Sequence, residues 1–160
     1  MPAIFSTVEQ LIDAANGGDV PTVNEEQRQA LKTARVTDIE YFYAPTAAFE
    51  GYKLLRVTVS PWNIFYDYVP KDSTADRFSY DSGISVCYSR EESSDSDDPL
   101  KALAEQAGIG LTEDGLLYEP GRQSITFAVG SSWMYIIVPE SMNEYETLKK
   151  LCKAEKIVKK

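Results

Sequence analysis

The sequence predicts a two-layer α+β fold, in which helices pack on a mainly antiparallel, meandering sheet of about six or seven strands. Short runs rich in β-branched and aromatic residues follow one another, separated by Gly and Pro turn signals. Helix start signals occur near the beginning, in the middle and near the end of the chain. A length of 160 residues with 43% hydrophobic residues suits a single domain that spans the whole chain.

The N-terminal part is expected to form two helices. Ser6 and Glu9 have the spacing of a capping box, and apolar side chains then recur at helical spacing as far as a Gly-Gly pair. Asn24 and Gln27 repeat this start signal in front of a second helix over 25–34. We therefore expect an N-terminal helical layer.

The stretch 41–69 holds half of the aromatic residues and is expected to form the middle of the sheet. It contains three β-branched and aromatic runs separated by Ala44-Pro45, Glu50-Gly51 and Ser60-Pro61, which are turn signals. These features predict three consecutive antiparallel strands. In the second of them, over 52–60, strict alternation would place Leu55 on the same face as the two valines that follow it.

The central part of the chain combines a strand with a short helix. Residues 84–89 alternate apolar with small polar side chains, which predicts a strand whose polar face looks to solvent. An acidic run follows, and Asp98 as N-cap with Pro99 at the first helical position predicts a helix. Gly108 is expected to end that helix after about ten residues.

The C-terminal part predicts a hairpin followed by a helix. Residues 124–129 alternate cleanly, Gly130-Ser131 suits a two-residue turn, and 133–138 is apolar on both faces. Such a two-sided strand fits either the centre of the sheet or a dimer contact. Ser141 and Glu144 form a second capping-box pattern before the last helix, and 156–158 would add a short edge strand or simply trail off.

The net charge of −9 argues against nucleic acid and anionic membrane surfaces as partners, since both favour clustered Lys and Arg. No run approaches the roughly 20 apolar residues that a membrane-spanning helix needs. Residues 1–6 lack the basic and apolar regions of a signal peptide, which leaves open whether a longer precursor exists. The expected partner is a protein or a small molecule.

Familiar catalytic and metal-binding patterns are missing from the sequence. The chain has no histidine, which removes the commonest general base and all Ser-His or Cys-His pairs. Cys87 and Cys152 do not form a C-x-x-C pair, so a zinc site is not expected, and they are either one disulfide or two buried thiols. The acidic run fails the spacing of a calcium loop. We therefore expect no cofactor, no metal and no catalytic residue.

Two groups of residues remain as candidate binding sites. Tyr52, Arg56 and Tyr66 are the candidate ligand-binding residues, because tyrosines offer flat area with a hydroxyl group. Asp67 lies between two tyrosines and could be a functional acid, but we expect it instead either to point to solvent or to form a cross-strand ion pair with Arg56. The candidate partner-binding residues belong to the acidic run and are Glu91, Glu92, Asp95, Asp97 and Asp98.

One pattern resembles a known group of domains. Tyr43-x-Pro45, a five-residue gap, Gly51-Tyr52-x-Leu54 and then Val57-x-Val59 is similar to a hairpin of uncharacterised extracytoplasmic domains in bacterial cell-surface and anti-sigma-factor-associated proteins. A strand with Trp133 and Tyr135, followed by Pro139 and a helix, is similar in style to their C-terminal end. The resemblance implies sensing or protein interaction outside the membrane, without catalytic residues. This chain differs from the group because it carries no transmembrane anchor.

These observations favour a non-catalytic binding or protein-interaction domain, presented outside the cytoplasmic membrane of a bacterium. The alternative is an acidic immunity or inhibitor-type protein that blocks a basic partner through the acidic run. An enzyme ranks third.

Overall fold

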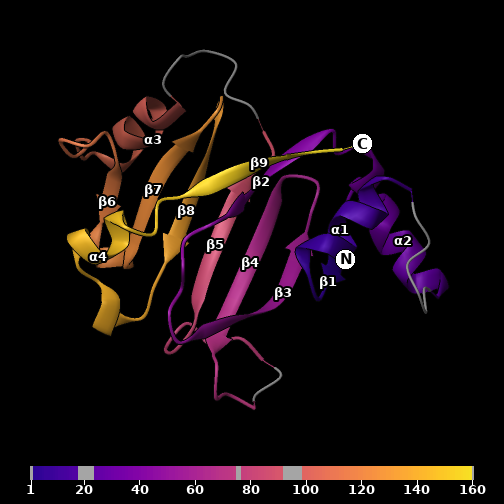
Figure 1. Cartoon of the computed structure of the whole chain (residues 1–160). Coiled ribbons are helices and arrows are strands. Elements are labelled where there is room, and N and C mark those ends of the chain that lie inside the picture. The colour runs from indigo at the N-terminus through magenta and orange to yellow at the C-terminus, as the bar shows by residue number, and fades with distance from the viewer. Residues whose placement is uncertain (1, 18–23, 75–76, 92–98, 160) are drawn as a thin grey trace.

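The computed structural model describes residues 2–17, 24–74, 77–91 and 99–159 (Figure 1). Within these residues, seven strands form one antiparallel sheet and two more form a separate antiparallel ribbon. From edge to edge, the sheet contains β1 (Ala3–Phe5), β3 (Tyr52–Val59), β4 (Asn63–Pro70), β5 (Ile84–Ser89), β8 (Ser132–Ile137), β7 (Ser124–Val129) and β6 (Leu117–Glu119). The ribbon contains β2 (Tyr41–Pro45) and β9 (Ala154–Val158).

The helices lie between and around these strands, and the predicted α+β fold is thereby confirmed. They are α1 (Val8–Ala15), α2 (Glu25–Thr33), α3 (Pro99–Ala107) and α4 (Tyr145–Lys149). Short 3-10 turns occupy Val36–Asp38, Pro120–Arg122 and Glu140–Met142. Two meanders, β3-β4-β5 and β6-β7-β8, meet where β5 pairs with β8, and the connection through α3 joins them.

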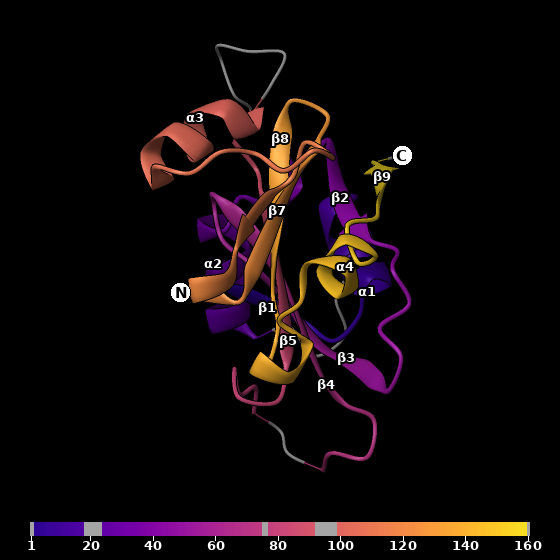
Figure 2. The ribbon, with the colours of Figure 1, turned by 90° about the vertical axis from the view of Figure 1, so that its left-hand side faces the viewer.

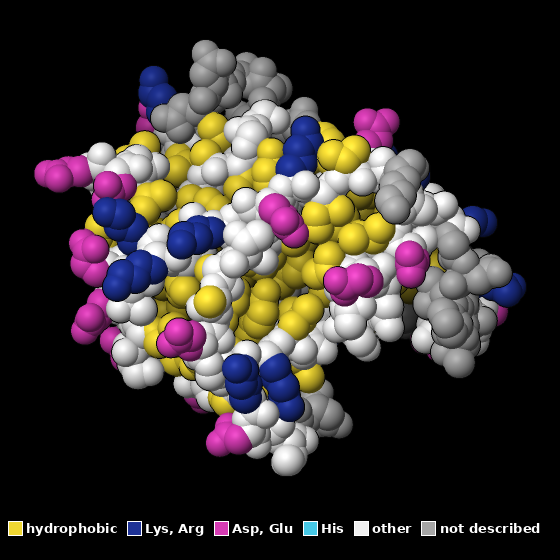
Figure 3. All heavy atoms as spheres, viewed as in Figure 1, with side chains coloured by type: hydrophobic (Ala, Val, Ile, Leu, Met, Phe, Trp, Pro, Cys, Tyr) yellow, Lys and Arg dark blue, Asp and Glu magenta, His cyan; other side chains and the backbone are white. Residues whose placement is uncertain are grey.

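The two faces of the sheet are covered differently. The ribbon, α1 and α4 lie on one side, which we call the ribbon face, and α3 lies on the other, the α3 face (Figure 2). On the ribbon face, acidic and basic side chains are interspersed with apolar ones (Figure 3).

The main core lies between the sheet and the elements on the ribbon face. Alternate side chains of the central strands are buried there, among them Val57, Ile64, Tyr66, Val86, Ile125, Met134 and Ile136. The hydroxyl group of Tyr66 donates to the backbone carbonyl of Tyr43 at 2.8 Å and links the sheet to the ribbon. Leu100 and Ala104 of α3 and Leu117 of β6 are also buried but lie outside this core.

The prediction that 41–69 forms the middle of the sheet is wrong for its first strand. Both edges of β3 are occupied, one by β1 and the other by β4. β2 therefore has no place in the sheet and pairs with β9 instead. The sequence analysis did not anticipate β1, whereas the short strand suggested for 156–158 is confirmed as part of β9.

A bulge interrupts the alternation predicted for β3. The register shifts between Leu54 and Arg56, so that Leu54 lies opposite Tyr68 while Arg56 lies opposite Asp67. Leu55 is the extra residue of the bulge. Leu54 and Arg56 therefore lie on opposite faces of the sheet, whereas strict alternation would place them on the same face. The strict alternation predicted for this strand is therefore not kept.

The polar face of β5 does not look to solvent as predicted. Ser85, Cys87 and Ser89 are at most 5% exposed. β5 lies between β4 and β8, and the half-buried side chains of Phe65 and Tyr135 lie opposite Cys87 on the two neighbouring strands. Small side chains on an internal strand are covered by larger neighbours of this kind.

The helix ends agree with the sequence in some places and not in others. The box of Asn24 and Gln27 is present, with bonds of 2.8 and 3.1 Å. The N-cap of α1 is Thr7 rather than Ser6, because the Thr7 hydroxyl group accepts from the backbone N–H of Gln10 at 3.2 Å. The predicted box of Ser141 is wrong, since that residue lies in a 3-10 turn and α4 begins after Glu144 without a side-chain cap.

The middle helix begins and ends as predicted within the described residues. Pro99 is its first residue and Gly108, with φ of 71°, follows its last turn. The predicted N-cap Asp98 lies outside the described residues.

Candidate functional site

The structure does not bring together the three residues predicted to bind a ligand. Tyr66 is fully buried on the ribbon face, where its hydroxyl group is already bonded. Tyr52 is half-buried at the start of β3 and packs against the same core. Arg56 lies opposite Asp67, one position along β4 from Tyr66, and therefore points to the α3 face. The three side chains cannot contact one ligand.

Arg56 instead belongs to a polar cluster that stabilises the α3 face of the sheet. Its Nε donates to Oδ2 of Asp67 at 2.9 Å, which realises the ion-pair alternative and not the solvent-facing one, and the Ser85 hydroxyl group donates to Oδ1 at 2.9 Å. Asp67 is only 6% exposed, so both carboxylate oxygens are satisfied inside the protein. The cluster has the character of a structural site.

Of the acidic run, only Glu91 lies within the described residues, and it is exposed. Glu92, Asp95, Asp97 and Asp98 lie outside them, so the structure places none of these four predicted partner-binding residues. Glu91 lines a hollow of about 350 Å³ near the β3–β4 turn.

Arg90 lines this hollow and connects two distant segments of the chain by hydrogen bonds. Its guanidinium donates to the backbone carbonyls of Ala34 and Ser60 at 2.6 Å and of Arg35 at 2.9 Å. Burial, together with the guanidinium of Arg35, lowers the pKa of Arg90. The Arg35 side chain is itself paired with Asp38 at 3.0 Å. These interactions already engage both guanidinium groups, so their donors serve the fold and not a ligand.

A larger hollow lies on the α3 face and is the candidate functional site. It has a volume of about 710 Å³, within the range of small-molecule sites, and we call it the α3 groove. Its walls come from α3 on one side and from β6, β7 and β8 on the other. The lining residues are Leu103, Gln106, Ala107, Leu117, Glu119, Arg122, Ser124, Thr126, Trp133, Tyr135 and Ile137.

An aromatic surface forms part of the sheet wall of the groove. The rings of Trp133 and Tyr135 lie 5.7 Å apart with 23° between their planes, because residues two apart on a strand share a face. Burial and the neighbouring Cys87 raise the pKa of Tyr135, so its hydroxyl group stays protonated. The half-buried pair presents flat apolar area together with an N–H and an O–H group.

Acidic, basic and amide groups lie beside this aromatic surface. Arg122 Nε is 3.5 Å from a carboxylate oxygen of Glu119, and the Arg122 side chain is 79% exposed. Gln106 is exposed on α3. The groove therefore combines aromatic area with planar hydrogen-bonding groups. This combination suits non-covalent binding of a polar ligand with apolar faces.

Sequence reasoning assigned Trp133 and Tyr135 to a central strand or a dimer contact and did not identify the groove. The alternation of the strand was a usable signal. Met134 and Ile136 share one face of it, and both are buried in the core. The two aromatics must then occupy the opposite face. Only the fold shows that α3 stops short of covering them.

The two cysteines are free thiols, so the disulfide alternative is not realised. Cys152 packs against the core of the ribbon face. Cys87 lies opposite Tyr135 on the neighbouring strand, and its thiol is beside the Tyr135 hydroxyl group on the α3 face. Burial raises the pKa of each thiol to about 12.

The described residues contain no group of three or more acidic or cysteine side chains placed to hold a metal ion. No helix within the same ranges is both long and apolar enough to cross a membrane. Comparisons with protein-family models, with curated proteins and with solved structures found no match.

Proposed function

We propose that this protein is a non-catalytic binding or interaction domain whose ligand occupies the α3 groove. The observation that carries the proposal is the groove itself, with an aromatic pair on one wall and polar groups beside it. Preformed hollows of this size with a few convergent polar groups are the usual places where proteins bind small ligands.

The polar clusters elsewhere in the described residues support binding rather than chemistry. The Asp67 carboxylate is engaged by Arg56 and Ser85, and the Arg90 guanidinium by backbone carbonyls. The raised pKa of Cys87 keeps its thiol protonated, so it is a poor nucleophile. We further propose that the domain acts outside the cytoplasmic membrane of a bacterium, which rests on the resemblance of its 43–59 sequence pattern, whose two strands do not pair with each other in the structure.

The two tryptophans allow a direct test of binding in the groove. Trp133 lines the groove, whereas Trp62 is 60% exposed at the β3–β4 turn. W62F leaves Trp133 as the only indole, and W133F is the matched control. Soluble oligosaccharides and short synthetic peptides would be titrated into both variants, with fluorescence emission as the readout. We expect at least one probe to change the emission of W62F in a saturable way.

The absence of any saturable change in the emission of W62F would contradict the proposal, and so would two further outcomes. A response confined to W133F would place binding at the β3–β4 turn and not in the α3 groove. Turnover of a bound probe that one Asp or Glu substitution abolishes would show that the protein is an enzyme.

The second candidate function is inhibition of a basic partner through the acidic run at 91–98. It is favoured by the five acidic residues of that run and by the net charge of −9. Binding to a basic protein should then weaken steeply as ionic strength rises, because exposed charges are screened. Binding that ignores salt, or that survives neutralisation of the run, would refute this second function.

A further inference from the structure

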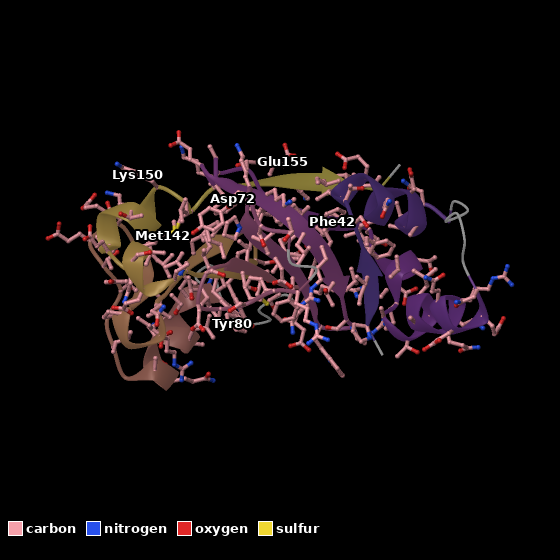
Figure 4. The ribbon with its side chains drawn as sticks, turned by 90° about the horizontal axis from the view of Figure 1, so that it is seen from below. Phe42, Asp72, Tyr80, Met142, Lys150 and Glu155 are labelled. Atoms are coloured by element: carbon pink, nitrogen blue, oxygen red, sulfur yellow. The ribbon has the colours of Figure 1, made fainter. Side chains whose placement is uncertain are left out.

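The α3 groove borders a second hollow at the far end of β8. A second hollow of about 340 Å³ shares Arg122 and Ile137 with it and extends to the loop before β5. Tyr80 of that loop is 58% exposed and points to the side of the sheet opposite Glu155 of β9 (Figure 4). The two hollows adjoin at Arg122 and Ile137, and we call them together the long groove, with Trp133 lining one hollow and Tyr80 the other.

The aromatic side chains are spaced along this long groove. Tyr80 packs edge-on against Phe78, with ring centroids 4.8 Å apart. It is also close enough to Tyr135 to affect the pKa of that group. A ligand lying in the groove would meet aromatic rings at three successive places, at Trp133, Tyr135 and Tyr80.

The polar lining has spare hydrogen-bonding capacity. Within the described residues, the Gln106 amide, the Thr126 hydroxyl group and the Trp133 indole N–H have no hydrogen-bond partner. Arg122 has only the 3.5 Å contact with Glu119. These donors and acceptors line the larger hollow, and Arg122 lines both hollows.

The construction of the floor disfavours an extended peptide as the occupant. Peptides that bind along a sheet gain affinity from main-chain hydrogen bonds to an open strand edge. β7 and β8 are both internal strands, paired on each side, so their backbone groups are already used. β6 is an edge strand, but with three residues it offers a peptide little main-chain pairing. The groove offers mainly side-chain contacts.

Charge disfavours a polyanionic occupant such as a nucleic acid. Among the described residues, Arg122 is the only cation that lines either hollow, whereas Glu119 lines the larger hollow and Asp81 and Glu140 line the smaller one. Nucleic-acid sites instead concentrate Lys and Arg. An uncharged polar ligand is the better match.

We propose that the long groove binds an uncharged oligosaccharide, an inference that rests on the proposed binding function. Sugar rings have apolar C–H faces that lie on aromatic rings, and they have peripheral hydroxyl groups that pair with planar side chains such as Gln106 and Arg122. A chain of sugars repeats these features and so follows the spaced aromatics from Trp133 to Tyr80. The ligand contacts both hollows at once.

The experiment uses W62F protein and three soluble tetrasaccharides, cellotetraose, maltotetraose and N,N′,N″,N‴-tetraacetylchitotetraose. Glucose and N-acetylglucosamine serve as single-ring comparisons. At least one tetrasaccharide should change the Trp133 emission saturably, and the matching monosaccharide should bind at least about tenfold more weakly, because it fills only one hollow.

Substitutions at exposed positions test the contacts without disturbing the fold. R122A and Q106A should each weaken tetrasaccharide binding about fivefold, as expected for the loss of one hydrogen bond. R28A is the matched control, since Arg28 is an exposed arginine on α2 away from the groove, and it should bind like the parent. Y80A should weaken the tetrasaccharide and leave monosaccharide binding unchanged.

The outcomes separate this inference from the proposed function. If no tetrasaccharide binds while a synthetic peptide changes the Trp133 emission, the sugar ligand is refuted and the groove remains a binding site. If neither class of probe binds, both proposals fail. Tetrasaccharide binding that Y80A does not weaken would refute the extended groove.

Discussion

Asp67 makes two interactions of similar length that should differ in energy. Its Oδ1 accepts from the Ser85 hydroxyl group and its Oδ2 from Arg56 Nε, each at 2.9 Å. Ser85 is 2% exposed, whereas the side chain of Arg56 is 40% exposed. Solvent screens the ion pair but not the buried hydrogen bond, so we expect the neutral partner to contribute more.

The magnitudes follow from this difference in exposure. A hydrogen bond to a buried charged group contributes about 1.5–3 kcal/mol. A partly exposed ion pair contributes roughly 0.2–1 kcal/mol after screening. Asp67→Ala should therefore destabilise the protein by about 3 kcal/mol, since it also leaves the Ser85 hydroxyl group buried without an acceptor.

Urea unfolding with a double-mutant cycle for each pair measures the two terms. Ser85→Ala removes one partner, and Arg56→Met removes the other while it keeps much of the aliphatic side chain. We expect a coupling energy of about 2 kcal/mol between Asp67 and Ser85 and about 0.5 kcal/mol between Asp67 and Arg56. A larger coupling to Arg56, or a cost of Asp67→Ala below about 1 kcal/mol, would refute this assignment.

Three further predictions concern the helix cap, the thiol and the pH dependence. Thr7→Ala should lower the free energy of unfolding by about 1 kcal/mol, whereas Ser6→Ala should leave it nearly unchanged. Urea denaturation measures both effects, and a larger effect of Ser6→Ala would contradict the observed N-cap. In a Cys152→Ser variant, Cys87 should react with a disulfide reagent at neutral pH only after unfolding, because burial raises the pKa of its thiol to about 12. Fast reaction of Cys87 in the folded protein would argue against this prediction. The Tyr145 hydroxyl group and then Lys149 lower the pKa of Asp114 below its ordinary value of 3.8. The stability that Asp114 contributes is therefore present above about pH 4 and is lost as the pH falls through its folded-state pKa, so the difference in melting temperature between wild type and Asp114→Asn should shrink in acid.

The sequence was sufficient where the determining interactions are local. The box of Asn24 and Gln27, the turn at Gly130 and the helix end at Gly108 each depend on residues within a few positions of one another. The ion pair between Arg56 and Asp67 was also predictable, because a short hairpin turn fixes which side chains face each other. The α+β fold class follows from such local signals taken together.

The candidate site was not predictable in the same way, because its residues come from distant parts of the chain. Gln106 and Trp133 meet only because α3 crosses the face of a sheet whose strand order differs from the chain order. Tyr52, Arg56 and Tyr66 are close in sequence, yet the alternation of β3 and β4 places Arg56 and Tyr66 on opposite faces. Proximity along the chain therefore misled the choice of site residues.

The sequence by itself determined the fold class, most helix ends and the β3–β4 and β7–β8 hairpins, since short-range capping, turn geometry and hydrophobic periodicity fix these features. The tertiary structure alone decided that β2 leaves the sheet to pair with β9, that the polar side of β5 is buried, and that Trp133 and Tyr135 face a groove. Each of these depends on which distant strand or helix occupies a neighbouring position. Which element takes that position is decided by the packing of the whole chain. It cannot be predicted from the sequence of any single segment.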